Sequence, residues 1–131
     1  MTLALARLVR ERANQRCEYC QLPHYALPLP FQVDHIIAEQ HGGRAEEVNL
    51  ALACAHCNRH KGPNIAGLDQ VTGQLVRLFN PRSDRWDDHF RMVNARVLGI
   101  SPVGRSTVEV LAMNSSDQIA LRTELLLNGE L

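Results

Sequence analysis

The sequence lacks any long apolar run and any recognisable leader segment. No stretch of the 131 residues reaches the run of about 18 consecutive apolar residues that a membrane-spanning helix needs. Residues 1–6 are followed at once by Arg7 and contain no small-residue cleavage site, so they do not resemble a signal peptide. We therefore expect a cytoplasmic protein with no membrane partner, and this length suits one domain.

The chain also has no formal net charge and only one lysine. Fourteen Lys and Arg residues balance 14 Asp and Glu residues, and a formal net charge of zero argues against a nonspecific nucleic-acid coat protein. Lys61 is the only lysine, and the other basic residues are arginines. Acidic residues are absent from residues 48–68, which contain His56, Arg59, His60 and Lys61. Positive charge is therefore concentrated in one segment, where a phosphate group would need it.

The four cysteines form two pairs with a two-residue gap, Cys17 with Cys20 and Cys54 with Cys57. In a chain without a leader, cysteines favour metal binding over disulfides, because the cytosol keeps thiols reduced. A two-residue gap lets both sulfurs bend round one ion, so the two pairs predict a structural zinc site with four thiolate ligands. Such a closed tetrahedral site has no open position for catalysis. Two chance pairs of buried thiols and a disulfide framework are the weaker alternatives.

The segment between and after the cysteine pairs predicts a strand–loop–strand–helix module. Residues 31–37 contain several β-branched side chains and favour a short strand, and residues 49–53 favour a second strand returning antiparallel to it. Gly42 and Gly43 indicate a turn or loop between the strands. Residues 54–61 are compatible with a helix, which the following Gly-Pro step would end.

The flanking segments predict a helix before this module and an extension after it. Residues 2–15 favour a helix capped by Thr2, and residues 21–30 favour an ordered loop because they contain three prolines. Beyond residue 64 we expect two strands, over residues 74–79 and 89–97, and two helices that begin near Ser101 and Ser115. The expected fold is α+β, a single domain over residues 1–131 with a core module at about 17–63 and an extension at about 64–131 packed on it.

The core module resembles the HNH nuclease family, whose fold is called ββα-metal. The resemblance covers roughly residues 17–63 and rests on Asp34-His35-Ile36-Ile37, Gly42-Gly43, Asn49-Leu50 and the run from Cys54 to Gly62. It implies a ββα-metal module stapled by the four-cysteine zinc site, and an endonuclease that hydrolyses DNA phosphodiester bonds. The segment from Leu78 to His89 also looks like the extension of many small stand-alone bacterial members.

The resemblance implies a role for four polar residues. His35 would be the general base that activates water, and histidine suits this task because its ordinary pKa lies near neutral pH. Asp34 and Asn58 would hold a catalytic divalent ion, which their oxygen ligands suit if it is Mg²⁺ or Mn²⁺. Many members have histidine at the position of Asn58, which leaves the identity of the ion open. Asn49, the central asparagine of the motif, would hold the His35 loop through backbone hydrogen bonds.

The geometry of a strand sets a condition on this assignment. Asp34 and His35 are adjacent, and successive side chains of a strand point to opposite faces. The two side chains can face one phosphate group only if the strand ends or kinks at this point, as the family's fold implies. Without the surrounding motifs, an Asp-His pair is more often two solvated polar side chains at the surface, or includes a hydrogen-bonded core histidine.

The basic residues have two interpretations. Arg59 and Lys61 are predicted to contact nucleic acid, or alternatively form a solvated helix face. The extension's arginines would enlarge the nucleic-acid surface or form internal ion pairs with neighbouring aspartates; they are Arg82, Arg85, Arg91, Arg96 and Arg105, among Asp84, Asp87 and Asp88. His41, His56 and His60 are interpreted as bystanders, with His60 as a replacement ligand if Asn58 faces away.

Two functional hypotheses follow. The first is a metal-dependent endonuclease that nicks DNA with low sequence specificity, as a monomer or homodimer, and the motif leaves RNA open as a substrate. The second is a non-catalytic, zinc-ribbon-like module that binds nucleic acid or protein. Asp34, His35 and Asn58 separate the two, because a binding module needs neither a base nor ligands for a hard metal ion.

The cysteine pattern generates a first prediction. Purified protein should contain close to one zinc ion per chain, because four thiolates complete one tetrahedral site. Elemental analysis of folded protein measures this ratio directly. A folded sample without zinc would remove the predicted site.

Overall fold

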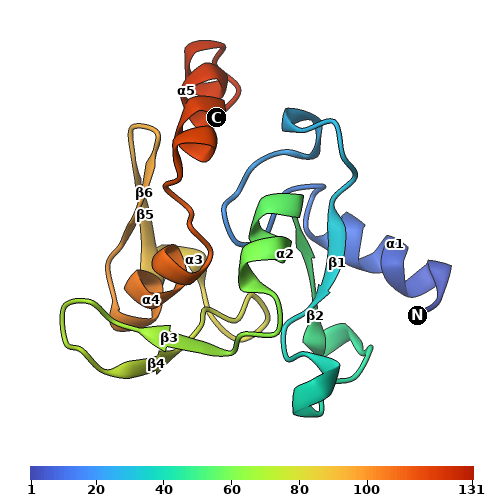
Figure 1. Cartoon of the computed structure of the whole chain (residues 1–131). Coiled ribbons are helices and arrows are strands. Elements are labelled where there is room, and N and C mark those ends of the chain that lie inside the picture. The colour runs from blue at the N-terminus through green and yellow to red at the C-terminus, as the bar shows by residue number, and fades with distance from the viewer.

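Three separate β-hairpins, rather than one continuous sheet, organise the protein. In the computed structural model, which describes residues 1–131, six strands pair in sequence order into three antiparallel two-stranded sheets. Five α-helices join and flank these hairpins (Figure 1). None of the helices combines the length and apolar character that a membrane crossing requires.

The first helix delivers the chain to the first cysteine pair. Helix α1 spans Leu3–Arg12, and the Thr2 side chain caps it by accepting a hydrogen bond from the Leu5 amide at 3.1 Å. It ends three residues before the predicted end at residue 15, because Asn14 and Gln15 adopt positive φ angles of 53° and 58°. This left-handed turn redirects the chain towards Cys17.

The predicted ββα module is confirmed. Strand β1 (Gln32–His35) pairs antiparallel with β2 (Leu50–Ala53), and His35 lies opposite Leu50 in the register. Helix α2 (Ala55–Lys61) packs against both strands, and its N-terminus is capped by the Cys54 sulfur. The loop between the strands forms two short 3-10 helices, η2 (Glu39–His41) and η3 (Glu47–Asn49).

The extension differs from the prediction at its second strand. The expected strand over residues 89–97 is wrong as a single element, because the chain turns at Asn94, with φ 53°, into a hairpin. Asparagine tolerates this left-handed conformation, so the turn forms without the glycine that usually marks one. The extension's elements are β3 (Ala66–Leu68), β4 (Leu75–Arg77), α3 (Trp86–His89), β5 (Phe90–Val93), β6 (Arg96–Gly99), α4 (Pro102–Val110) and α5 (Ser116–Leu127).

The helix starts in the extension match the prediction, whereas β3 and α3 were not predicted. The Ser101 and Ser115 side chains cap α4 and α5 by accepting hydrogen bonds from the amides of Gly104 and Gln118. The strand expected at residues 74–79 is β4, shortened to Leu75–Arg77.

Aromatic and polar contacts join the extension to the core module. The ring of Phe79 packs edge-on against Tyr19, with centroids 6.5 Å apart, and the Trp86 indole donates to the Tyr19 carbonyl at 2.7 Å. Arg82 forms an ion pair with Glu18. One cluster of buried apolar side chains runs through both parts of the chain, from Val9 to Leu125. Figure 1 shows α2 between the first hairpin and the extension.

Arg122 organises the C-terminal part of the extension from inside. This arginine of α5 has no exposed surface, and its guanidinium donates to the carbonyls of Ala95 and Met113 and to the side chains of Asn114 and Gln118. Asn114 in turn exchanges two hydrogen bonds with the backbone of Val97. A single side chain therefore fixes α5, the segment before it and the turn of the β5–β6 hairpin.

The buried position of Arg122 predicts a large effect on stability. Arg122→Met should lower the free energy of unfolding by about 3 kcal/mol or more, because buried carbonyl groups lose their donors. Arg91→Met is the matched control, since Arg91 is exposed and should change stability by less than about 0.5 kcal/mol. Chemical denaturation of the two variants measures the difference, and equal stabilities would contradict the structural role of Arg122.

Candidate active site and zinc centre

The four cysteines meet at one buried point. All four are buried, and their sulfur atoms lie within 4.8 Å of one another. The Cys20 and Cys54 sulfurs are 3.7 Å apart, close to the separation of about 3.8 Å that tetrahedral Zn–S bonds of about 2.3 Å would give. In each pair the sulfur of the first cysteine accepts a hydrogen bond from the backbone amide of the second cysteine at 3.4 Å. The donor set and its geometry therefore fit a structural zinc ion.

Hydrogen bonds fix the first cysteine pair to the second strand. The Glu18 amide donates to the Leu52 carbonyl at 2.8 Å, and the Glu18 carboxylate accepts from the Leu52 amide at 2.8 Å. Arg82 pairs with the same carboxylate. Residues 17–20 are thus attached to β2 independently of a metal ion, a role for Glu18 that only the folded register reveals.

Asn49 holds the loop that follows His35. Its side-chain oxygen accepts from the Ile37 amide at 2.8 Å, and its side-chain nitrogen donates to the carbonyls of Ile37 at 3.0 Å and Arg44 at 2.9 Å. Gly43 is needed beside it, since an added Cβ would lie 1.7 Å from the Ile37 carbonyl oxygen. These are the backbone hydrogen bonds expected for the central asparagine of the motif.

His35 ends β1 with one ring nitrogen free. Its Nε2 is buried and makes no hydrogen bond, and the Glu39 carboxylate approaches it only to 3.7 Å. The side chain as a whole remains 23% exposed. Buried polar atoms normally have partners, so an unpaired imidazole nitrogen at the end of a strand is a notable exception. It is the kind of atom that a water or substrate oxygen would complete.

Asp34 lies in a different environment from His35. Its carboxylate is 7% exposed; Oδ2 accepts from the Tyr19 hydroxyl at 2.9 Å and pairs with the Lys61 ammonium at 3.2 Å. Burial raises the pKa of Asp34, and the charge of Lys61 and the Tyr19 hydrogen bond oppose that rise. Burial and the adjacent carboxylate raise the pKa of Tyr19 well above its usual value, so its hydroxyl stays protonated and donates.

The structure corrects the expectation for Lys61. This lysine was predicted to contact nucleic acid, yet its side chain is only 2% exposed and its ammonium donates to the His35 carbonyl at 3.0 Å. A group enclosed in this way cannot present a charge to a phosphate at the surface. Sequence reasoning also missed Tyr19, although its position between Cys17 and Cys20 was a visible signal. For Lys61, the corresponding signal was that it is the only lysine of the chain.

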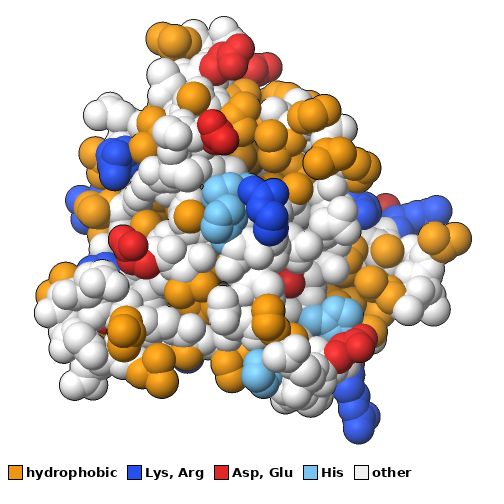
Figure 2. Space-filling model, in the orientation of Figure 1, with side chains coloured by type: hydrophobic (Ala, Val, Ile, Leu, Met, Phe, Trp, Pro, Cys, Tyr) orange, Lys and Arg blue, Asp and Glu red, His pale blue; other side chains and the backbone are white.

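Helix α2 presents two further predicted residues. Asn58 is half-buried and lies one turn before Lys61, a spacing that places it on the same side of the helix as the lysine that contacts Asp34. Arg59 is exposed, and Figure 2 shows basic and histidine side chains together over the position of α2, which carries His56, Arg59 and His60. The His56 and His60 rings lie 4.1 Å apart, and both bond backbone carbonyls.

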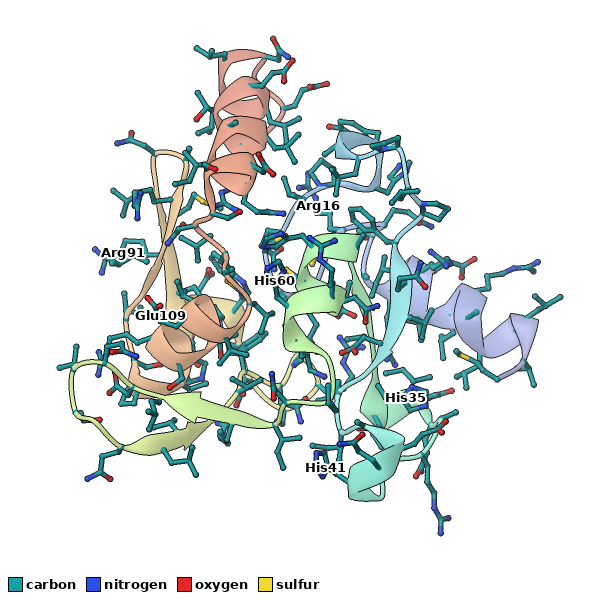
Figure 3. All side chains as sticks on the ribbon, viewed as in Figure 1. Arg16, His35, His41, His60, Arg91 and Glu109 are labelled. Carbon is teal, nitrogen blue, oxygen red and sulfur yellow. The ribbon has the colours of Figure 1, made fainter.

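The predicted residues thus fall into two groups. Asp34 contacts Tyr19 and Lys61, and Asn58 lies one turn before Lys61 on α2, whereas strand alternation directs the His35 ring away from Asp34. Figure 3 shows His35 at the lower end of β1, on the side away from α2. The strand ends at His35, and Asp34 and His35 remain successive residues of one paired strand, with their side chains on opposite sides of it.

The extension's arginines divide between internal and exposed positions. Arg82 pairs with Glu18 and Arg105 with Asp69, so neither uses the aspartates proposed from the sequence. Asp84 pairs instead with Arg77, a residue outside the predicted set. Arg91 and Arg96 are exposed and form no ion pair.

The hydrogen bonds of Asn49 generate a prediction. Asn49→Ala should accelerate amide hydrogen exchange at Ile37 by roughly ten-fold or more, because about one hydrogen bond's worth of local stability, about 1–1.5 kcal/mol, is lost there. Zinc content should stay unchanged, since the cysteines do not contact this side chain. Asn64→Ala, at an exposed position, is the control. Unchanged exchange at Ile37 would show that Asn49 does not hold the loop.

Comparisons with known proteins agree with this geometry. A family model described as HNH endonuclease matches residues 17–64. The chain is also 25% identical over 111 residues to the Septu protein PtuB of Bacillus thuringiensis, an alignment that covers 83% of this chain and 40% of the relative. The chain therefore spans less than half the length of this relative. A comparison with solved structures found no match to the chain. Residues 17–64, with their two strands, helix and four clustered cysteines, form a domain of the HNH endonuclease family.

Proposed function

We propose that this protein is a divalent-metal-dependent endonuclease that hydrolyses DNA phosphodiester bonds. The family match of residues 17–64 supports a nuclease acting on nucleic acid. The observation that carries the proposal is the buried, unpaired Nε2 of His35 at the end of β1. A ring nitrogen without an internal partner can take a proton from a water molecule that reaches it.

Each of the four polar residues has a task in this proposal. His35 is the general base, and Asn49 keeps the loop behind it in place through its bonds to Ile37 and Arg44. Asp34 and Asn58 are the ligands of a divalent ion, Mg²⁺ or Mn²⁺, because both offer oxygen atoms and Asn58 lies one helical turn before Lys61, which contacts Asp34. When bound, the ion would neutralise negative charge on the phosphate group.

The surface supports contacts to the phosphate backbone rather than to bases. Arg59, Arg91 and Arg96 are exposed and form no ion pair. Phosphate contacts position a protein on a duplex but carry no sequence information. We therefore propose a nicking enzyme of low sequence specificity that acts in the cytoplasm as a monomer or homodimer, with DNA as the substrate and RNA as the alternative. The similarity to PtuB supports a Septu-type role for the chain.

One observation favours a second candidate, a zinc-dependent module that binds nucleic acid or protein without cutting it. The carboxylate oxygen Oδ2 of Asp34 is already occupied by Tyr19 and Lys61, and the His35 ring points away from Asp34. A module of this kind would keep the zinc centre and the exposed arginines. It would have no need of the free His35 nitrogen, which is why hydrolysis is the preferred proposal.

The nuclease proposal predicts nicking of supercoiled plasmid in the presence of Mg²⁺ or Mn²⁺. His35→Ala should reduce the rate by about 100-fold or more, which is the usual contribution of a general base. Zinc content and melting temperature should be unchanged. His41→Ala is the matched control, because this exposed histidine of η2 has no role in the proposal and should cut like the parent protein.

Three other outcomes have distinct meanings. Equal nicking by the parent and His35→Ala would identify a contaminating nuclease and remove His35 from the mechanism. Binding of DNA in a shift assay without any nicking would favour the non-catalytic module. Cleavage of RNA alone would keep the chemistry and change the substrate.

A further inference from the structure

Lys61 is a buried charge that the proposed mechanism does not use. It is the only lysine of the chain, and its side chain is 2% exposed. Its ammonium makes two contacts with adjacent residues of β1: the Asp34 carboxylate oxygen Oδ2 at 3.2 Å and the His35 carbonyl oxygen at 3.0 Å. One cation therefore holds the side chain of the proposed metal ligand and the main chain of the proposed base.

The surroundings of Lys61 explain why it stays in place. It is the last residue of α2, and it shares a cavity of about 170 Å³ with Ile36 of the core module and with Leu78 and Phe79 of the extension. The cavity is also lined by the polar residues Arg77, Asn80 and Ser83, but the ammonium bonds none of them, and Asp34 and the His35 carbonyl are its only polar partners. A buried cation is tolerated only when it is paired and hydrogen-bonded, so the position is built around these two contacts.

The contacts of Asp34 are asymmetric. Tyr19 and Lys61 both approach Oδ2. The other carboxylate oxygen, Oδ1, has no internal donor, which leaves it as the oxygen available to a metal ion. The Tyr19 hydroxyl and the Lys61 ammonium together determine the orientation of the carboxylate, and they do so from two segments that both carry cysteines of the four-cysteine cluster.

We propose that Lys61 is a resident cation of the site, a positioning residue that neutralises Asp34 and fixes the His35 main chain before any divalent ion binds. The inference rests on the proposed function, because it concerns the metal ligand and the base of that mechanism. The ammonium takes one carboxylate oxygen and leaves the other to the ion. A divalent ion then binds against the repulsion of a neighbouring positive charge, so the site is preformed but holds its ion weakly.

This proposal differs in its consequences from a purely structural ion pair. If Lys61 only stabilises the fold, removing its charge lowers stability equally with and without a divalent ion. If Lys61 is the resident cation, a neutral residue leaves Asp34 without a counter-charge, and a divalent ion can supply one. Added ion should then stabilise the neutral variant more than the parent protein, because a ligand stabilises the folded state more strongly the more tightly it binds.

The test compares Lys61→Met, Lys61→Gln and Lys61→Arg by thermal melting in divalent-free buffer and with Mn²⁺, with zinc content measured in every sample. The Met and Gln variants should melt below the parent protein without Mn²⁺, and the rise in melting temperature on adding Mn²⁺ should be at least two-fold larger than for the parent. Lys61→Arg keeps the charge and should respond like the parent. The Gln variant retains a donor for the His35 carbonyl, so it separates the effect of the charge from the effect of the hydrogen bond. It also replaces the Met variant in the comparison if that variant does not fold.

A second substitution locates the effect. Adding Asp34→Asn to Lys61→Gln should abolish the extra response to Mn²⁺, because the carboxylate that binds the ion is gone. An equal response to Mn²⁺ in the parent and both neutral variants would overturn the proposal, as would a large response that survives Asp34→Asn.

Plasmid nicking provides the separate reading on catalysis. At saturating Mn²⁺ the neutral variants should nick roughly ten-fold or more slowly than the parent, because the carboxylate and base are less well positioned. A parent protein that does not nick would overturn the proposed function, while the melting comparison would still decide whether Lys61 and Mn²⁺ compete at Asp34.

Discussion

The clustering of four thiols is the constraint on which the rest of the core depends. It joins residues 17–20 to residues 54–57, and both segments also contribute to the site: Tyr19 lies inside the first pair, and α2 begins at the second. The two-stranded sheet between them is too small to be stable alone. A zinc ion would thus connect the segment that orients Asp34 from one side to the helix that reaches it from the other.

The extension completes this core rather than adding a separate layer. Phe79 and Trp86 support Tyr19, and Leu78 and Phe79 share the cavity of Lys61. Farther along, burial lowers the pKa of the Arg122 guanidinium, and the nearby sulfurs of Cys20, Cys57 and Cys54 oppose that effect. The guanidinium has no carboxylate partner, and its positive charge complements the negative charge that the cysteines carry as thiolates.

The sequence predicted the core module well because its requirements are local. Cysteine spacing, the β-branched side chains of residues 31–37 and the Gly-Pro stop after α2 each depend on a few neighbouring residues, and the helix caps at Ser101 and Ser115 are equally local. The hairpin of β5 and β6 was missed because its turn uses Asn94 without a glycine. The environment of Lys61 could not be predicted, because its ion-pair partner Asp34 and the cavity residues Leu78 and Phe79 are distant from it in the sequence.

The register of β1 against β2 gives the site an unusual sensitivity to chain length. His35 lies opposite Leu50, and Asp34 lies opposite Ala51. Because they are successive strand residues, their side chains point to opposite faces of the hairpin. Deleting one residue from β1 would exchange these faces, sending a carboxylate outward and an imidazole towards Lys61 without altering composition elsewhere. The loop between Ile37 and Asn49 carries no such restriction beyond the contacts of Gly43 and Arg44. Relatives could therefore vary in length at residues 39–42, whereas the strand must keep its count.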